Sequence, residues 1–356
     1  MTKVLYIWWL QLKRRWMLLL VVFVLAFSTG LLIKAAKAGE QYLYSTWQES
    51  ATLVDVIIGY KGSPIQIIAN ALYRLENPTG NISAETYDYW TKHPLVDKSC
   101  AVSMGDNING FPLVGVESNY FDWFGITLVE GAMPEGPHDI VLDQGLANDL
   151  GLQIGDALQS SHGSDSRGEG HAHPFKVVGL LQANRTADQD CFFTTPEAYL
   201  DLHHQSARTY TSLLLKLKSK SALLMLPGTL AKRPDEQGAF PVFVFGQIQK
   251  QWEPTLVTGR KLGMGLSILM ALLFLAMLWN IAGNERATKA YLKNLKWSKT
   301  AIAFASSGLY SLFGLAGLWI AVRLIQLNFE GTVQPYDYLG CLALWLVSLL
   351  LMHNRK

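Results

Sequence analysis

Charged residues are scarce in this sequence of 356 residues. Asp, Glu, Lys and Arg make up only 16% of it, apolar residues make up 50%, and the mean hydropathy is +0.17. So low a charge content is atypical of a soluble globular protein, and a net charge of +2 is too small to indicate a nucleic-acid partner. The composition indicates a membrane protein with a sizeable polar portion.

Cysteine is also rare, and enzymatic motifs are missing. Cys100, Cys191 and Cys341 show no metal-site spacing. Cys100 and Cys191 fall in the polar portion, where an oxidising compartment would allow a disulfide between them. The sequence contains no Gly-x-Ser-x-Gly elbow, no His-Glu-x-x-His and no complete phosphate loop. We therefore expect a chain that catalyses no reaction itself.

Long uncharged apolar runs, in contrast, are abundant. Four of them predict transmembrane helices, at residues 16–33, 262–284, 300–322 and 338–352. The first three are long enough to cross the hydrocarbon core, which takes about 20 helical residues, whereas the shorter fourth would need Arg355 and Lys356 to snorkel. A cleaved signal peptide is the alternative for the first run. That run is long for a signal core, however, and Lys34 intervenes before the small-residue site at 36–38.

The charges beside these runs predict their orientation. Residues 1–15 carry four basic side chains and no acidic one, and residues 285–299 carry five basic side chains against Glu285 alone. Both segments are expected in the cytoplasm, as is the tail 353–356. The link 323–337 and the large block 34–261 are then expected on the far side of the membrane, with both termini cytoplasmic.

The block 34–261 has the pattern of a mixed α+β periplasmic domain inserted between the first two of four transmembrane helices. Its beginning predicts a helical stalk over 35–52, a strand over 53–58, and a helix from Pro64 that ends at 77–81 and has the apolar face Ile65, Ile68, Leu72 and Leu75. Residues 139–158 predict, in this order, a strand, a short helix ended by Gly151, a turn at 155–156 and a second strand. A further strand is predicted over 175–181, and a strand followed by a helix is predicted over 191–203.

The stretch GYKGSP near the start of this block contains the residue types of a phosphate-binding loop. Its members are Gly59, Lys61, Gly62, Ser63 and Pro64. In a phosphate loop lysine directly precedes the hydroxyl residue, whereas here Gly62 separates the two, and the predicted compartment is not that of ATP. We interpret the stretch as a structural glycine turn. Binding of an anionic group by Lys61 and Ser63 at the helix start is the alternative.

Two motifs within this arrangement of segments resemble those of a known family. IVLDQGLANDLGLQIGDAL followed by FKVVGLL, together with GYKGSPIQIIANALYRLENPTGNI, is similar to segments of the MacB-like (FtsX-like, type VII) ABC transporter permeases. The resemblance implies a homodimeric or paired permease that works with two cytoplasmic ABC ATPase subunits. ATP and Mg would be bound by those subunits, and this chain would have no cofactor of its own. Members of the family transmit ATP-driven motion to their periplasmic domains, which is called mechanotransmission.

The resemblance also implies that the ATPase docks on the segment 285–299. The ATPase-coupling residues would be Glu285, Arg286, Lys289, Tyr291, Leu292, Lys293, Leu295 and Trp297. The sequence alone shows a basic helix with an apolar stripe of Ala287, Tyr291, Leu292 and Leu295. An interfacial helix whose lysines meet anionic membrane lipids is the alternative. Lys296 stands where the family usually has glycine.

The loop 160–176 is rich in histidine and glycine. His162, His171 and His173 lie there beside Asp165 and Glu169, and such residues could hold zinc, copper or another divalent metal. A solvated polar loop without a metal is the alternative. A membrane-anchored periplasmic metal-binding or adaptor protein without an ATPase is accordingly the alternative function. The sequence does not identify the cargo or any periplasmic partner protein.

The third apolar run has small residues at helical spacing. They are Ala303, Ser307, Ser311, Gly314 and Gly317. Small residues let membrane helices approach closely, either within one chain or across a dimer seam, and both interpretations stay open at this point.

Overall fold

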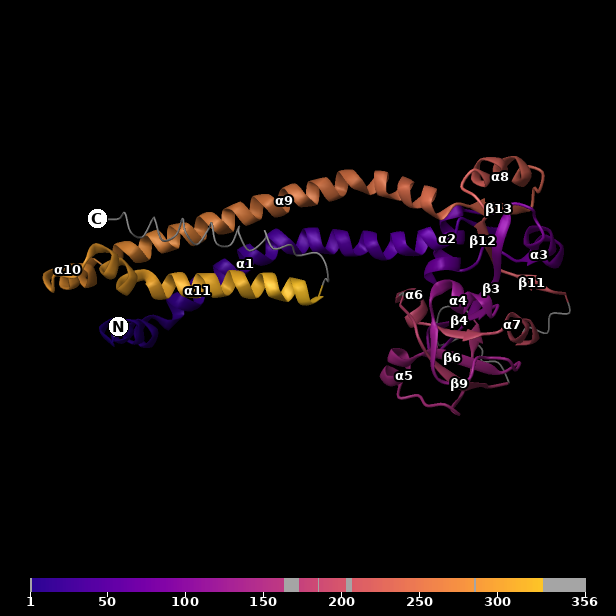
Figure 1. Ribbon diagram of the computed structural model, residues 1–356, viewed down its shortest axis with the longest axis horizontal. Helices are drawn as coiled ribbons and strands as arrows, with labels where there is room; N and C mark the ends of the chain where they lie inside the picture. Colours follow the sequence, from indigo (N-terminus) through magenta and orange to yellow (C-terminus); the bar gives the residue numbers. More distant parts are fainter. Residues whose placement is uncertain (1, 163–172, 185, 203–206, 285, 329–356) are drawn as a thin grey trace. The chain divides into compact units, whose positions relative to one another are not determined.

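The structure is a computed structural model that describes residues 2–328, apart from 163–172, 185, 203–206 and 285 (Figure 1). The chain divides into two compact units. We call Ser45–Gln251 the inserted domain, and Met1–Tyr44 together with Trp252–Lys356 the helical unit. Each unit is described by itself.

The inserted domain is built on one mixed sheet with the strand order β13-β1-β12-β3-β4-β10-β6-β9-β5, in which β7 also pairs with β9 and β8 with β3. Its strands are β1 (Val56–Tyr60), β3 (Val96–Ile108), β4 (Phe111–Val116), β5 (Thr127–Gly131), β6 (Asp139–Asp143), β7 (Ala157–Leu158), β8 (Ser161–His162), β9 (Phe175–Gln182), β10 (Phe192–Thr194), β12 (Ser212–Leu217) and β13 (Glu236–Ala239). A second small sheet joins β2 (Ile82–Ser83) to β11 (Thr209–Tyr210).

The long strand β3 connects the two halves of the main sheet. Its first part pairs with β12 from Val96 to Val102, and its second part pairs with β4 from Val102 to Ile108. β3 and β4 are joined by a two-residue turn, Asn109–Gly110, in which both residues have positive φ. Such a turn matches the natural twist of an antiparallel pair and favours Asn-Gly.

Helices cover both faces of this sheet (Figure 1). They are α2 (Pro64–Tyr73), α3 (Ala84–Thr91), α4 (Asn119–Phe124), α5 (Gln144–Leu150), α6 (Thr186–Gln189), α7 (Pro196–Leu202) and α8 (Ala222–Leu230). Successive strand residues point to opposite faces, so Ile57 packs with the cluster that includes α2 and α4, whereas Val56 and Ile58 pack with the cluster that includes α3 and α8. Burial on both sides explains why β1, with the sequence VIIGY, is almost continuously apolar.

Several predicted elements of the inserted domain are confirmed. Strands occupy 139–143 and 175–182, α7 follows β10, and Gly151 ends α5 with a φ of 67°. The prediction for the beginning of the block is partly wrong. The strand starts at Val56 and includes Gly59, because α1 (Thr2–Leu53) extends through the predicted strand start. The first helix ends at Tyr73, where Arg74 adopts a left-handed conformation, and not at 77–81.

The apolar face predicted for that helix is also partly wrong. Ile65 and Leu75 are 52% and 53% exposed, whereas the buried apolar residues of α2 are Ile67, Ile68, Ala71 and Leu72. A face of Ile67, Ile68, Ala71 and Leu72 has the same helical spacing, so periodicity alone did not decide which face packs on the sheet.

The disulfide that the sequence allowed is not formed. Cys100 and Cys191 are both buried and are not bonded to each other, and the Cys100 thiol donates to its neighbour's carbonyl, Ala101 O. Burial raises the pKa of Cys100 above its ordinary value, which keeps the thiol protonated. Both cysteines therefore serve as small apolar core residues.

The helical unit consists of the outer parts of α1 and α9 (Pro241–Asn284) with α10 (Arg286–Asn294) and α11 (Lys299–Asn328). Among the described residues, three helical segments are long and apolar enough to cross a membrane: Lys3–Leu32, Pro241–Ile281 and Gly308–Ile325. Large apolar residues of α1, such as Trp16, Met17 and Leu20, are at least half exposed, as lipid-facing residues would be. The fourth predicted span, 338–352, lies outside the described residues.

The core of the helical unit explains two glycines of the small-residue face. A Cβ on Gly317 would lie 2.5 Å from the carbonyl oxygen of Phe23, and one on Gly314 would lie 2.9 Å from the ring of Phe274. Both glycines therefore allow α11 to pack closely against α1 and α9. For these two positions the structure supports packing within one chain.

This close approach predicts opposite effects of alanine at two helical glycines. Gly317→Ala places a methyl group against backbone and should cost about 1–3 kcal/mol of stability. Gly263→Ala in α9 meets nothing within 4 Å and should be neutral or slightly stabilising, because alanine favours helix. Thermal melting of the detergent-purified protein measures both. Equal melting temperatures for the two variants would contradict the proposed packing.

Candidate functional site

The predicted coupling segment forms the short helix α10, and the residues that follow it form a hydrogen-bonded capping turn. The backbone N–H of Trp297 donates to Leu292 O and that of Lys296 donates to Lys293 O, while Lys296 has a φ of 58°. These are the two bonds of a Schellman cap with a left-handed residue at its centre. Lys296 thus adopts a left-handed conformation, which glycine adopts most readily.

The apolar stripe of α10 divides into a buried and an exposed part. Leu292 is only 2% exposed, whereas Tyr291 is 66% and Leu295 is 49% exposed. The basic residues Arg286 and Lys293 are exposed on the same helix. Of the remaining predicted coupling residues, Lys289 and Trp297 are described, while Glu285 lies outside the described part, as does the side chain of Ala287 from the apolar stripe. The segment therefore presents two exposed apolar side chains together with exposed basic ones.

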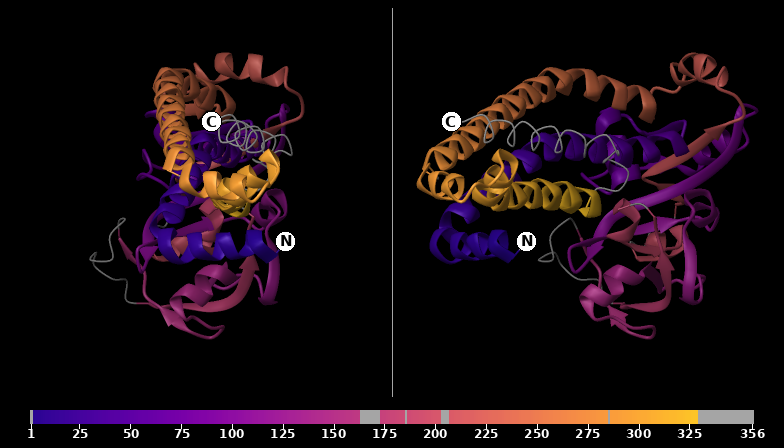
Figure 2. Two further views of the ribbon diagram at one scale, coloured as in Figure 1. Left: turned by 90° about the vertical axis from the view of Figure 1, so that its left-hand side faces the viewer. Right: turned by 60° about the vertical axis from the view of Figure 1, so that its left-hand side comes forward.

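A cavity of about 770 Å³ lies between α10 and the N-terminal segment of α1. Arg15 has a non-helical φ/ψ of −133° and 28°, so the preceding residues form a helical arm with a direction of their own (Figure 2). The cavity is lined by Lys3, Tyr6, Ile7, Leu10, Gln11, Arg14, Arg15, Thr288, Tyr291, Leu292, Leu295 and Trp297. Sequence reasoning missed the contribution of this arm. Its basic residues interleaved with aromatic ones were the available signal.

Three contacts hold the arm on α11. Gln11 Nε2 donates to Ser306 O at 2.7 Å, and Trp8 Nε1 donates to Phe304 O at 3.3 Å. The Trp8 ring also lies 5.0 Å from the Phe304 ring. A Cβ on Gly308 would lie 2.9 Å from Trp8, so this glycine makes room for the indole. The arm is thereby fixed within the helical unit.

The GYKGSP stretch forms the end of β1, a turn and the start of α2. A Cβ on Gly62 would lie 2.7 Å from Thr79, whose hydroxyl donates to Tyr60 O at 2.9 Å. The Lys61 N–H donates to Asp235 O, and the Ser63 hydroxyl makes no capping hydrogen bond to α2. Close packing accounts for Gly62, and the Lys61 side chain is exposed.

The histidine loop is only partly described. The His171 and His162 side chains lie outside the described part, while His173 is exposed and its ring lies 5.7 Å from that of His138. His138 was not among the predicted ligands, and its Nδ1 is buried without a hydrogen-bond partner among the described residues. No group of three or more potential ligands is found within the part of the chain that the structure describes. The metal site stays a prediction.

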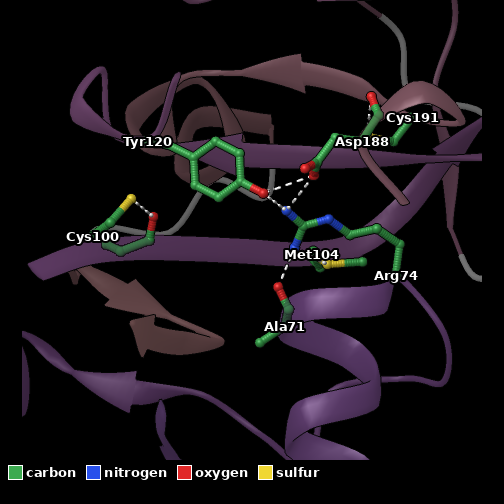
Figure 3. A network of polar contacts seen from close by, with 8 residues as sticks. Ala71, Arg74, Cys100, Met104, Tyr120, Asp188 and Cys191 are labelled. Atoms are coloured by element: carbon green, nitrogen blue, oxygen red, sulfur yellow. Dashed lines mark hydrogen bonds and ion pairs between the residues drawn. The ribbon is translucent and has the colours of Figure 1, made fainter. Parts of the chain in front are cut away.

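Arg74 is the centre of a buried network of polar contacts in the inserted domain (Figure 3). Its Nη2 donates to Tyr120 OH at 2.6 Å and forms an ion pair with Asp188 Oδ1 at 3.4 Å, and Tyr120 OH donates to the same Oδ1 at 2.7 Å. Its Nη1 donates to Ala71 O. Burial opposes the charge, but Tyr120 and Asp188 outweigh this cost, so the pKa of Arg74 lies above its ordinary value. The network joins α2, α4 and α6.

Comparison with known proteins gives a family match for this architecture. The model of the MacB-like periplasmic core domain matches residues 19–224. The chain belongs to this family. It is a MacB-like ABC transporter permease by family, and its sheet-rich inserted domain is the periplasmic core domain of that family.

Three solved structures similar to this MacB-like permease are distant from it in sequence. The periplasmic region of MacB from Actinobacillus actinomycetemcomitans has 13% identity and a TM-score of 0.39, covering 57% of this chain and 97% of that one. The extracellular domain of the noncanonic ABC-type transporter YknZ from Gram-positive bacteria has 13% identity and a TM-score of 0.32, covering 48% and 87%. A domain of a permease protein from Porphyromonas gingivalis has 10% identity and a TM-score of 0.29, covering 52% and 86%. No curated protein sequence matches the chain significantly.

The left-handed conformation of Lys296 in this MacB-like permease predicts that two glycine substitutions have opposite effects on the stability of α10 and its cap. Lys296→Gly removes a penalty of about 1 kcal/mol and should strengthen the cap of α10. Lys293→Gly, inside the same helix, should weaken α10 by about 1 kcal/mol. Hydrogen–deuterium exchange of the peptide covering 291–297 reports both. Faster exchange in Lys296→Gly would show that the left-handed turn is wrong.

The Arg74 network predicts a large difference between two ion pairs. Asp188→Asn leaves a buried guanidinium without its counter-charge and should cost about 3–5 kcal/mol. Asp88→Asn breaks the Asp88–Arg208 pair, whose side chains are 51% and 46% exposed, and should cost less than about 1 kcal/mol. Thermal melting of both variants tests this, and similar losses would contradict a special role of Arg74.

Proposed function

We propose that the chain is the permease subunit of an ABC transporter and that a separate cytoplasmic ABC ATPase docks on α10. The observation that carries the docking is the pair of exposed apolar residues, Tyr291 and Leu295, on a basic helix between two candidate spans. Exposed aromatic and aliphatic residues are typical anchors of protein interfaces. Family membership supports the same assignment.

In this proposal, ATP hydrolysis is coupled to the periplasmic domain by mechanotransmission. α1 and α9 each contribute residues to both units, so a displacement imposed at α10 can be carried along hydrogen-bonded helices. The ATPase binds ATP and Mg, and this chain is non-catalytic. The result is the export or extraction of a cargo whose chemistry no described residue selects.

The assembly follows from the same proposal. A second copy of the permease completes a homodimer in the bacterial inner membrane, with both termini in the cytoplasm and residues 34–261 in the periplasm. Membrane lipids surround the spans, a periplasmic partner protein receives or delivers the cargo, and nucleic acid has no part. Zinc or another divalent metal at His162, His171 and His173 is a separate hypothesis, tested by calorimetry on the His171→Ala, His173→Ala variant.

The docking proposal is tested by co-purification of the ATPase with the permease. Tyr291→Ala combined with Leu295→Ala removes both exposed anchors and should reduce ATPase recovery at least tenfold, since each lost anchor is worth about 1–2 kcal/mol. The matched control is Leu224→Ala combined with Met225→Ala in α8, which removes two residues that are 84% and 63% exposed in the inserted domain. Undiminished recovery with the α10 variant would refute docking at this helix.

A further inference from the structure

The cavity between the N-terminal arm and α10 has a one-sided charge. Its cationic lining residues are Lys3, Arg14 and Arg15, and no Asp or Glu lines it among the residues that the structure describes. Lys3 and Arg14 are exposed, so their charged groups are available to a ligand at the cavity mouth. A cavity with this lining attracts an anion, and the arginines offer the multiple N–H donors that suit a phosphate group.

The remaining lining is mostly apolar. Ile7 and Leu10 come from the arm, and Leu292, Leu295 and Trp297 come from α10 and its cap. A small inorganic ion would leave this apolar surface uncovered, whereas an amphiphile with a phosphate and a hydrocarbon portion would match both parts of the lining.

Gln11 adds a requirement for a hydrogen-bond donor. It lines the cavity and is only 7% exposed, and its Nε2 is committed to Ser306 O. Its Oε1 is buried and accepts no hydrogen bond from any described residue. A buried acceptor without a donor is costly, so a ligand hydroxyl reaching Oε1 would be favoured.

The place of the cavity along the chain suits a lipid. Its arm residues form the N-terminal end of the candidate span Lys3–Leu32 and precede the uncharged run 16–33, and its α10 residues lie between the helices α9 and α11 that contain the other two candidate spans. The cavity therefore lies where helices leave the hydrocarbon core, which is the depth of lipid headgroups. Basic pockets at this depth are typical binding sites for anionic lipids.

We propose that the cavity binds one anionic phospholipid whose headgroup carries hydroxyl groups, as in phosphatidylglycerol. Its phosphate meets Lys3, Arg14 and Arg15, a headgroup hydroxyl donates to Gln11 Oε1, and its acyl chains leave along the apolar lining. The bound lipid ties the arm to α10 and so sets the position of the helix. This site requires no ATPase, so its test is independent of the docking proposal.

The test measures binding of a fluorescent phosphatidylglycerol to the full-length permease, purified without ATPase in an uncharged detergent. The wild-type chain should bind it at least tenfold tighter than the phosphatidylcholine analogue. Arg14→Gln should weaken binding about fivefold, and Arg14→Gln combined with Lys3→Gln more than twentyfold. The matched control is Lys13→Gln on the same arm. Lys13 lies over the Trp9 ring and does not line the cavity, so its loss should change binding less than twofold.

Two further binding experiments identify the chemistry of the ligand. Phosphatidylmethanol has the same charge without the hydroxyls and should bind several-fold more weakly than phosphatidylglycerol, and Gln11→Met should reduce this difference. Glycerol phosphate at millimolar concentration should not displace the lipid. Displacement would assign the site to a soluble phosphate and overturn the lipid proposal. Equal binding of phosphatidylcholine and phosphatidylglycerol, or equal effects of Arg14→Gln and Lys13→Gln, would also overturn it.

Discussion

The arrangement of three helices of the inserted domain is tied to the buried cation of Arg74. Arg74 ends α2 in a left-handed conformation, and its guanidinium joins α2 to α4 through Tyr120 and to α6 through Asp188. A buried cation is tolerated only where hydrogen bonds and a counter-charge surround it, so these three helices have one arrangement that satisfies it. Apolar packing alone would allow them to slide; the charge specifies their register on the sheet.

The sheet itself extends through both halves of the inserted domain because β3 is long enough to pair with β12 and then with β4. Burial of alternate residues in different clusters, as for Ile57 and Ile58, makes each strand contribute to both faces. The two halves of the inserted domain are therefore joined by hydrogen-bonded strands as well as by side-chain packing.

In the helical unit, two positions of irregular backbone border the cavity. Arg15 interrupts α1 and lets the N-terminal arm turn, and Lys296 ends α10 in a conformation that normally selects glycine. Arg15 and the neighbour of Lys296, Trp297, both line the cavity. The arm, the cap and α10 thus contribute to one cavity, and a ligand bound there would contact all three.

The amino-acid sequence by itself determined the apolar runs, the inserted domain between the first two of them, and the strands and helices whose ends are marked by residues such as Gly151 and Pro64. Those features depend on local periodicity and on turn residues, which act over a few positions. Family motifs pointed to α10 as the coupling element.

Only the tertiary structure decided which faces pack. The buried side of α2 could not be chosen from periodicity, because two overlapping sets of apolar residues share the helical spacing. The burial of Cys100 and Cys191 without a disulfide between them, the close fit of Gly317 against Phe23, and the meeting of residues 3–15 with residues 288–297 depend on contacts between distant segments. Such contacts leave no local pattern, since each segment has the same propensity whether or not its partner is present.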